Sequence, residues 1–198
     1  MNLGRFGAVL ALAMMIPAGA PAHSEDAVAT PAVSPVPATF TVPTLVRTPK
    51  FQLVPLGPAL VKIDFDAYMS SVEHLQKTFT RSSDWPHAGI TDADAMRDME
   101  TEQARFLART SFAYAVLTPD GRRERGCVYV YPSPVKGYDA EVRMWVTKAE
   151  HDAGFDTELY AWVQDWMRND WPFANVAYPG RAIAWDVWDV LAVAKKSG

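Results

Sequence analysis

Apolar residues recur with a helical period in three stretches of the chain. The spacing that places side chains on one helix face predicts helices over residues 64–79, 91–110 and 155–167. Asp64 or Asp66 could cap the first, and Thr91 with Asp94 opens the second. The apolar stripe of the third helix consists of Phe155, Leu159, Val163 and Met167.

Between the second and third predicted helices the period changes to that of strands. Three β-rich runs cover residues 111–118, 126–133 and 138–147. Asp120-Gly121 separates the first two runs, which is a strong hairpin signal. Shorter strands are expected over residues 51–57 and 173–180, and residues 185–193 close the chain. The predicted order is therefore strand, helix, helix, three antiparallel strands, helix, strand, a mixed α+β domain.

The first 49 residues have a different character. Arg5 precedes an apolar run, and Ala20 and Ala22 fit a cleavage site before His23, so residues 1–22 are expected to be a signal peptide. Residues 23–49 are rich in Pro and Ala and are predicted to be a disordered linker, which leaves residues 50–198 as the domain. The expected location is periplasmic or secreted, with no membrane span after cleavage; a start at Met14 or Met15 would make the protein cytoplasmic.

Composition removes several classes of function. A formal charge of -4 and a pI near 5.5 disfavour nucleic-acid binding, which needs a basic face. Cys127 is the only cysteine, so no disulfide can form within the chain, and its apolar surroundings favour a core position. Neither an H-E-x-x-H motif nor a cysteine cluster is present, and no metal site is predicted.

The segment EVRMWVTKAEHDAGFDTELYAWVQDWM, residues 141–167, together with the order of elements, resembles the GNAT superfamily of acyl-CoA-dependent N-acyltransferases. The phrase WPF..V.YPGR, from Trp171 to Arg181, is also similar to that found in GNAT-like proteins. The resemblance implies a mostly antiparallel central sheet flanked by helices, and acetyl-CoA or another acyl-CoA as cofactor. The implied cofactor-binding residues are Val146, Lys148, His151, Gly154, Phe155, Asp156 and Thr157.

This cofactor loop departs from the family pattern, which usually has a basic residue at its start and a small residue at its end. Asp156 replaces the last glycine, and a carboxylate about 4 Å from a phosphate costs on the order of 4 kcal/mol at an effective dielectric of about 20. Thr147 with Glu150 fits a capping box, and acids favour a helix start. Both a retained CoA site and a purely structural helix cap therefore stay open.

The resemblance also suggests where catalysis would occur. Glu141 and Tyr178 are the candidates to deprotonate an amine and to protonate the leaving thiolate. The loop between the first two helices supplies the candidate substrate-binding residues, which are Arg81, Asp84, Trp85 and His87. The predicted function is acyl transfer to a small-molecule or peptide amine, or an inactive descendant of such an enzyme. The alternative is a non-catalytic periplasmic module that binds a ligand or protein.

Overall fold

The computed structural model describes residues 34–194. The predicted signal peptide and residues 23–33 lie outside this range. Residues 34–194 belong to one compact unit, which contains every element described below. Among residues 34–194, no helix is both long and apolar enough to cross a membrane.

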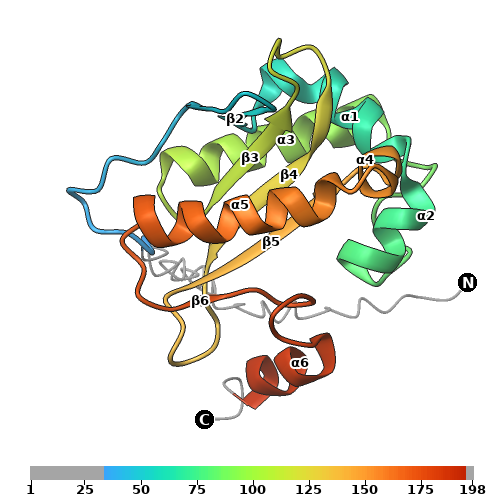
Figure 1. The fold of residues 1–198 in the computed structure, drawn as a ribbon. Helices are drawn as coiled ribbons and strands as arrows, with labels where there is room; N and C mark the ends of the chain where they lie inside the picture. The colour runs from blue at the N-terminus through green and yellow to red at the C-terminus, as the bar shows by residue number, and fades with distance from the viewer. Residues whose placement is uncertain (1–33, 195–198) are drawn as a thin grey trace, which may run out of the picture. The chain divides into compact units, whose positions relative to one another are not determined.

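A six-stranded sheet runs through the unit with its strands in chain order (Figure 1). The strands are β1 (Val46–Arg47), β2 (Gln52–Pro55), β3 (Phe112–Leu117), β4 (Glu124–Pro132), β5 (Ala140–Val146) and β6 (Val176–Ala177). The pairs from β1 to β5 are antiparallel, whereas β5 and β6 are parallel. The predicted hairpin joins β3 to β4, with Gly121 at a positive φ of 73°. The mixed, mostly antiparallel sheet is the predicted one.

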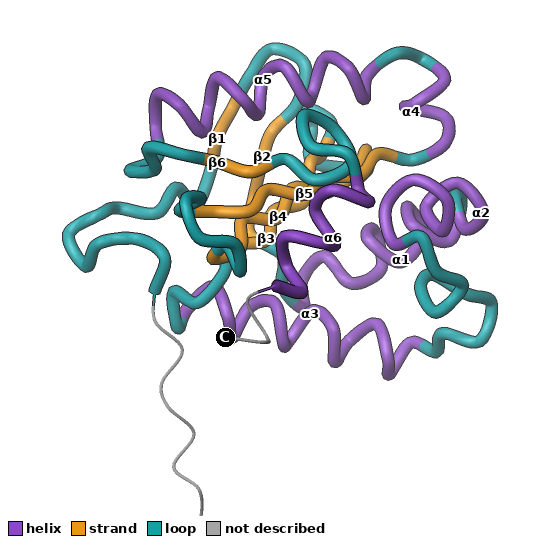
Figure 2. The backbone as a smooth tube through the Cα atoms, turned by 90° about the horizontal axis from the view of Figure 1, so that it is seen from below, coloured by secondary structure: helices purple, strands orange, loops and turns teal. Residues whose placement is uncertain are grey.

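Helices cover both faces of the sheet. They are α1 (Val61–Met69), α2 (Val72–Leu75), α3 (Asp92–Leu107), α4 (Lys148–Asp152), α5 (Phe155–Asp170) and α6 (Trp185–Ala194), with a 3₁₀ turn η1 (Pro58–Leu60) and a π-helical turn η2 (Gln76–Thr80). Figure 2 shows α5 on one side of the strands and α1 and α3 on the other. The chain therefore forms three layers, helix, sheet and helices.

Side chains of β5 alternate between two cores. Val142, Met144 and Val146 pack in the core beneath α5, with Phe155 and Leu159. Trp145 points the other way, into the core that α1 and α3 share with the sheet. Each fully buried large side chain stabilises the fold by about 1.5–3 kcal/mol relative to exposure.

The single helix predicted over residues 64–79 is broken in the structure. α1 begins at Val61, so Asp64 lies inside it and does not cap it. The break falls at two serines: the Ser70 hydroxyl donates to the Ala67 carbonyl at 2.6 Å, and Ser71 Oγ accepts from the backbone N–H of Lys148 at 2.8 Å. Serine hydroxyls compete with helical hydrogen bonds in this way. The break ties α2 and η2 to the end of β5.

The domain begins earlier than the predicted boundary at residue 50. Val36 is buried in the core beneath α5, and Val46 pairs with Leu53 of β2. Prolines cannot donate backbone hydrogen bonds, but their carbonyls still accept them. Tyr114 Oη donates to the Pro43 carbonyl at 2.9 Å, and Arg109 donates to the carbonyl of Pro37 at 2.8 Å. The part of the expected linker from residue 34 to residue 49 therefore packs on the domain.

Candidate functional site: a cationic pocket where two strands part

The parallel strands β5 and β6 separate soon after they meet. Their ladder consists of Ala140 with Val176 and Glu141 with Ala177. β5 continues to Val146, whereas β6 ends at Ala177 and the chain turns away at Gly180, whose φ is 74°. Within the described residues, the edge of β5 that faces β6 is therefore without a strand partner from residue 142 to residue 146. Such an edge presents backbone N–H and C=O groups that can bind an extended ligand.

A pocket of about 340 Å³ lies at this opening. Its lining comes from five segments of the chain, which are His74 with Lys77–Phe79, Arg143–Val146, His151 with Asp156, Pro179–Arg181, and Trp185. The volume falls in the usual range for small-molecule sites, about 300–1,000 Å³. The strand parting, η2, the start of α5 and the start of α6 thus enclose one pocket.

The connection from β5 to α5 positions one wall of this pocket. Thr147 caps α4 by accepting from the backbone N–H of Glu150 at 3.3 Å. The predicted capping box is only half formed, because the Glu150 carboxylate instead binds Arg123 and Arg125, at 2.7 and 2.5 Å. Gly154 then adopts a left-handed conformation, with φ 82°, and α5 begins.

The seven predicted cofactor-binding residues do not all reach the pocket. Val146, His151 and Asp156 line it. The Lys148 side chain binds Asp152, and the Phe155 ring is buried with the Arg125 guanidinium 3.3 Å from its centre. The other two, Gly154 and Thr157, are exposed and are not part of the lining.

Asp156 is paired, which alters the electrostatics expected from the sequence. Its two carboxylate oxygens accept hydrogen bonds of 2.9 and 2.7 Å from the Arg181 guanidinium. Burial raises the pKa of Asp156, but the hydrogen bonds and charge of Arg181 outweigh it, and the net pKa lies below the ordinary value. A bidentate pair of this kind is strong and geometrically specific. The repulsion of an anionic ligand by Asp156 is therefore offset within the site.

The remaining charged groups make the pocket cationic. Lys77, Arg143 and Arg181 line it with the one acid Asp156. Arg181 pairs with Asp156 and Arg143 pairs with the neighbouring Glu141, so the net charge is +1, from Lys77, when the histidines are neutral. The rings of His74 and His151 lie 4.8 Å apart. The pKa of His74 is lowered by burial first, then by His151 and Lys148. An anion would thus meet net positive charge beside the N-terminus of α5, where backbone N–H groups lack helical partners.

The two candidate catalytic residues occupy different places. Glu141 is buried at the point where β5 and β6 part, and it pairs with Arg143 of the pocket. Tyr178 packs on Tyr160 at 5.6 Å and lines a separate hollow beside α5, and burial raises its pKa to about 12. The structure therefore places Glu141 beside the pocket and Tyr178 outside its lining, because the Tyr178 side chain joins the core beneath α5.

The candidate substrate loop is also divided. Arg81 pairs with Asp189 of α6 at 2.9 Å and lies 4.3 Å from the Trp185 ring centre. Asp84, Trp85 and His87 instead line a hollow of about 590 Å³ beside α3. The structure thus assigns Arg81 to the contact with α6 and the other three residues to one surface.

A third hollow, of about 250 Å³, lies between α1 and α3. It is lined by three acids and by aromatic and apolar groups, namely Asp64, Asp98 and Glu102 with Leu56, Phe79, Thr80, Trp85, Met99, Tyr129 and Tyr131. Phe79 lines both the cationic pocket and this acidic hollow, so the two cavities adjoin at this residue.

The basic side chains of the pocket, Lys77, Arg143 and Arg181, were not among the predicted site residues. Two signals were available. Arg143 interrupts an otherwise buried strand, and Arg181 follows the turn Pro179-Gly180. Neither signal says which carboxylate the arginine meets, because Arg181 and Asp156 are 25 residues apart.

The fold is that of the GNAT acetyltransferases. It is defined by the strand order, by the parting of β5 from β6, and by the helix that starts beyond β5. Solved structures similar to it include the ribosomal-protein-S5-alanine acetyltransferase from Vibrio fischeri, at 12% identity and TM-score 0.50, over 63% of this chain and 67% of that one. RimL, a ribosomal L7/L12 α-N-protein acetyltransferase in complex with coenzyme A, matches at 13% identity and TM-score 0.50, over 64% and 70%.

A Vibrio cholerae structure assigned as a ribosomal-protein-serine acetyltransferase matches at 12% identity and TM-score 0.48, over 62% of this chain. The chain covers 65% of that protein, less than two thirds of its length. Searches of protein-family models and of curated proteins gave no match. At these identities the similarity establishes the fold alone.

Proposed function

We propose that this chain is an acyl-CoA-dependent N-acyltransferase that transfers an acyl group to an amine. The observation that carries the proposal is the parting of β5 from β6, with a cationic pocket and the N-terminus of α5 at the opening. The similar RimL structure holds coenzyme A on the same fold, which supports the choice of cofactor.

The residues of the pocket fit such a cofactor. The free edge of β5 can pair with the amide groups of an extended pantetheine arm, as a strand edge pairs with a peptide. Lys77 and Arg181 supply cations for phosphate oxygens, and α5 supplies unpaired N–H groups. Coenzyme A, when bound, would supply the activated acyl thioester.

Glu141 is the chain's own group best placed for proton transfer. It lies at the vertex of the opening, on the strand whose free edge would hold the acyl end of the ligand. Arg143 keeps its carboxylate oriented through an ion pair. In the proposed reaction Glu141 accepts the proton that the amine loses on attack, directly or through one water. Tyr178 has no role in this proposal.

The acceptor would approach from the acidic side of Phe79. The hollow beside α3 and the hollow between α1 and α3 share Trp85 and Asp98. Carboxylates and aromatic rings together favour a positively charged amine. A peptide N-terminus or a small aliphatic amine fits this description.

Turnover can be measured directly on the purified full chain. Acetyl-CoA is incubated with a panel of peptide and small aliphatic amines, and released thiol is followed together with the mass of the acylated product. Glu141→Gln should lower kcat about 100-fold or more, the usual contribution of a positioned base. Glu100→Gln, an exposed acid on α3, is the matched control and should be unchanged. Absence of turnover with every amine, in a protein that binds acetyl-CoA, would contradict the catalytic part of the proposal.

The non-catalytic binding module is the second candidate, and the Asp156–Arg181 pair favours it. In that pair the Asp156 carboxylate already lies at the start of α5, where a phosphate would bind, and it pairs with Arg181. The two candidates also differ in location, because acyl-CoA is a cytosolic metabolite and the predicted signal peptide would export the chain. Mass spectrometry of the native N-terminus decides between them: a chain that begins at His23 favours the exported module, and a chain that begins at Met14 or Met15, without most of the apolar run, favours the enzyme.

A further inference from the structure

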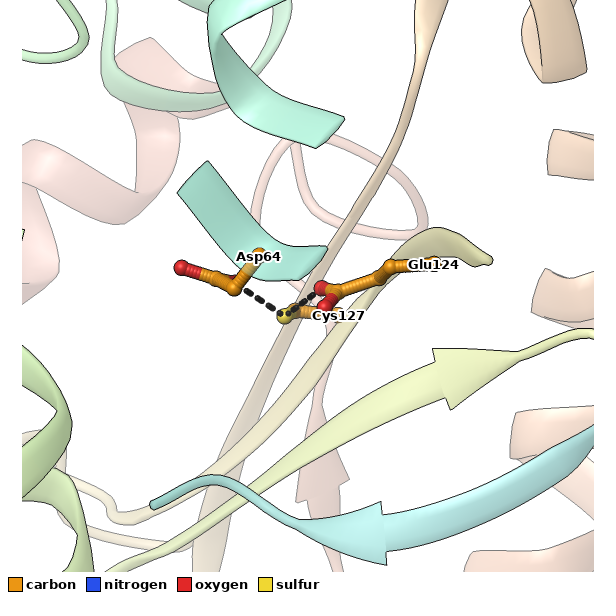
Figure 3. A group of neighbouring side chains, drawn as sticks. All are labelled: Asp64, Glu124 and Cys127. Atoms are coloured by element: carbon orange, nitrogen blue, oxygen red, sulfur yellow. Dashed lines mark hydrogen bonds between the residues drawn. The ribbon is translucent and has the colours of Figure 1, made fainter. Parts of the chain in front are cut away.

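Three side chains that can bind a metal ion meet in the buried layer between α1 and the sheet. They are Asp64, Glu124 and Cys127, with 5%, 1% and 0% of their surface exposed. Cys127 Sγ lies 2.9 Å from Glu124 Oε1 and 3.7 Å from Asp64 Oδ1, and one ligand atom of each residue lies within 4.8 Å of the others. Figure 3 shows the two carboxylates approaching the sulfur from α1 and from the start of β4.

An irregularity in β4 brings Glu124 into this cluster. In a regular strand, residues three apart point to opposite faces. Here Leu117 pairs with Glu124 whereas Val116 pairs with Gly126, so one extra residue of β4 forms a bulge. A bulge re-aims side chains, and this one places Glu124 on the same side as Cys127. Gly126 permits it, because a Cβ there would lie 2.0 Å from the Trp145 carbonyl oxygen.

The cluster lacks a positive partner among the described residues. Within residues 34–194, no Lys, Arg or His forms an ion pair with Asp64 or Glu124. Glu124 Oε2 is buried without a hydrogen-bond partner, although its carboxyl group points at the sulfur. Burial raises the pKa of Asp64 to about 6 and the pKa of Glu124 and Cys127 well above their ordinary values. Two acids and a thiol buried in this way must either be protonated or bind a cation.

We propose that Asp64, Glu124 and Cys127 form a binding site for a divalent cation with the preferences of Zn²⁺. Tetrahedral zinc, with bonds of about 2.3 Å to sulfur and about 2.1 Å to oxygen, separates a sulfur and an oxygen ligand by about 3.6 Å. The distance from Cys127 to Asp64 already matches, and the distance to Glu124 has to open by less than an ångström. The thiolate favours zinc over Mg²⁺ or Ca²⁺, which prefer ligand sets made only of oxygen.

The structure also supplies an entry route and a fourth ligand position. Asp64 lines the acidic hollow between α1 and α3, so a hydrated cation can reach the cluster from that side. A water molecule on the hollow side would complete a tetrahedron. A bound cation would tie α1 to β4 beneath the floor of the hollow. The site adjoins the hollow proposed for the acceptor, but its test needs neither acetyl-CoA nor an amine.

The test is metal binding by the purified full chain. Zinc is titrated against a chromophoric chelator, and Co²⁺ is used as a spectroscopic probe of the thiolate. We expect one equivalent of zinc, release of protons on binding, a Co²⁺–thiolate absorption band in the near ultraviolet, and a higher Tm with zinc than with a chelator. Glu124→Gln and Cys127→Ser should each weaken zinc binding at least tenfold. Asp66→Asn, an exposed acid on the same helix, should leave binding unchanged.

The proposal fails if the unmodified chain binds no zinc, if its Co²⁺ complex lacks the thiolate band, or if Glu124→Gln binds zinc as tightly as the original. Any of these outcomes means that Asp64, Glu124 and Cys127 do not together bind zinc. The Co²⁺ band requires no substitution, so the proposal stays testable even if a variant does not fold.

Discussion

The pairing of Asp156 with Arg181 leads to two substitutions with opposite effects on acetyl-CoA binding. Arg181→Gln leaves Asp156 unpaired in the pocket, whereas Asp156→Asn frees Arg181 for the ligand. Both side chains are about one fifth exposed, at 21% and 23%, so solvent screens them only in part. The first substitution should weaken binding and the second should strengthen it.

The expected change in acetyl-CoA binding follows from the separation of the charges. Two unit charges about 4 Å apart interact by about 4 kcal/mol at an effective dielectric of about 20. Partial exposure and salt reduce this, and we take about half as the net effect. Arg181→Gln should therefore raise the Kd for acetyl-CoA about 30-fold or more. Asp156→Asn should lower it about tenfold, because Arg181 also loses a partner that held it in place.

Isothermal titration calorimetry at two ionic strengths measures both effects. Arg168→Gln is the matched control, because it also removes one positive charge. Arg168 lies on α5 outside the pocket, its side chain is 69% exposed, and it pairs with Asp165. The differences should shrink as salt rises from about 0.05 M to about 0.5 M. An unchanged Kd for Arg181→Gln, or weaker binding by Asp156→Asn, would refute the charge argument. A chain that binds no acetyl-CoA in any variant would instead refute the proposed function.

Three further predictions concern stability, each measured by chemical denaturation. Gly126→Ala should lower the free energy of unfolding by about 2–4 kcal/mol, because the new Cβ collides with the Trp145 carbonyl; an effect below about 0.5 kcal/mol would mean that the strands adjust freely. Thr91→Ala should lower the free energy of unfolding by about 1 kcal/mol, because it removes the capping box of α3. Thr101→Ala, at an exposed position within α3, should lower it by less, and equal effects would contradict a capping role. Burial raises the pKa of Glu150, but Arg125 and Arg123 outweigh burial and hold the pKa below the ordinary 4.5. The stability that this carboxylate contributes is therefore present above about pH 4.5 and is lost as the pH falls further. Glu150→Gln should accordingly be destabilising at pH 7 and nearly neutral near pH 3, and a difference independent of pH would exclude this linkage.

Local patterns predicted much of the fold. The stripe from Phe155 to Met167 is buried on α5, and Asp120-Gly121 forms the predicted hairpin, because both depend on residues close in sequence. In β5, Val142, Met144 and Val146 pack in one core and Trp145 packs in the other, as the fixed period of a strand dictates.

Features that depend on distant partners were not predictable in this way. The break at Ser70-Ser71 is stabilised by Lys148, which lies 77 residues away from Ser71. The Pro-rich segment packs on the domain because Tyr114 and Arg109 bind its carbonyls, and no local pattern reveals such acceptors. The period of β4 alone would place Glu124 and Cys127 on opposite faces, and only the pairing with β3 reveals the bulge.

The predicted site residues included the loop from β5 to α5 but not the basic side chains that line the pocket. The loop from β5 to α5 does line the pocket through His151 and Asp156. Its charge could not be predicted, because Arg181 comes from beyond β6 and Lys77 from η2. Tyr178 follows β6 as expected, but its orientation depends on Tyr160 of α5.

Binding of acetyl-CoA to the unmodified full chain tests the central claim most directly. Calorimetric titration should show one site with a Kd in the micromolar range, and free coenzyme A should compete for it. If millimolar acetyl-CoA produces no saturable heat, and no shift in the thermal unfolding of the chain, then the pocket between β5 and β6 is not an acyl-CoA site.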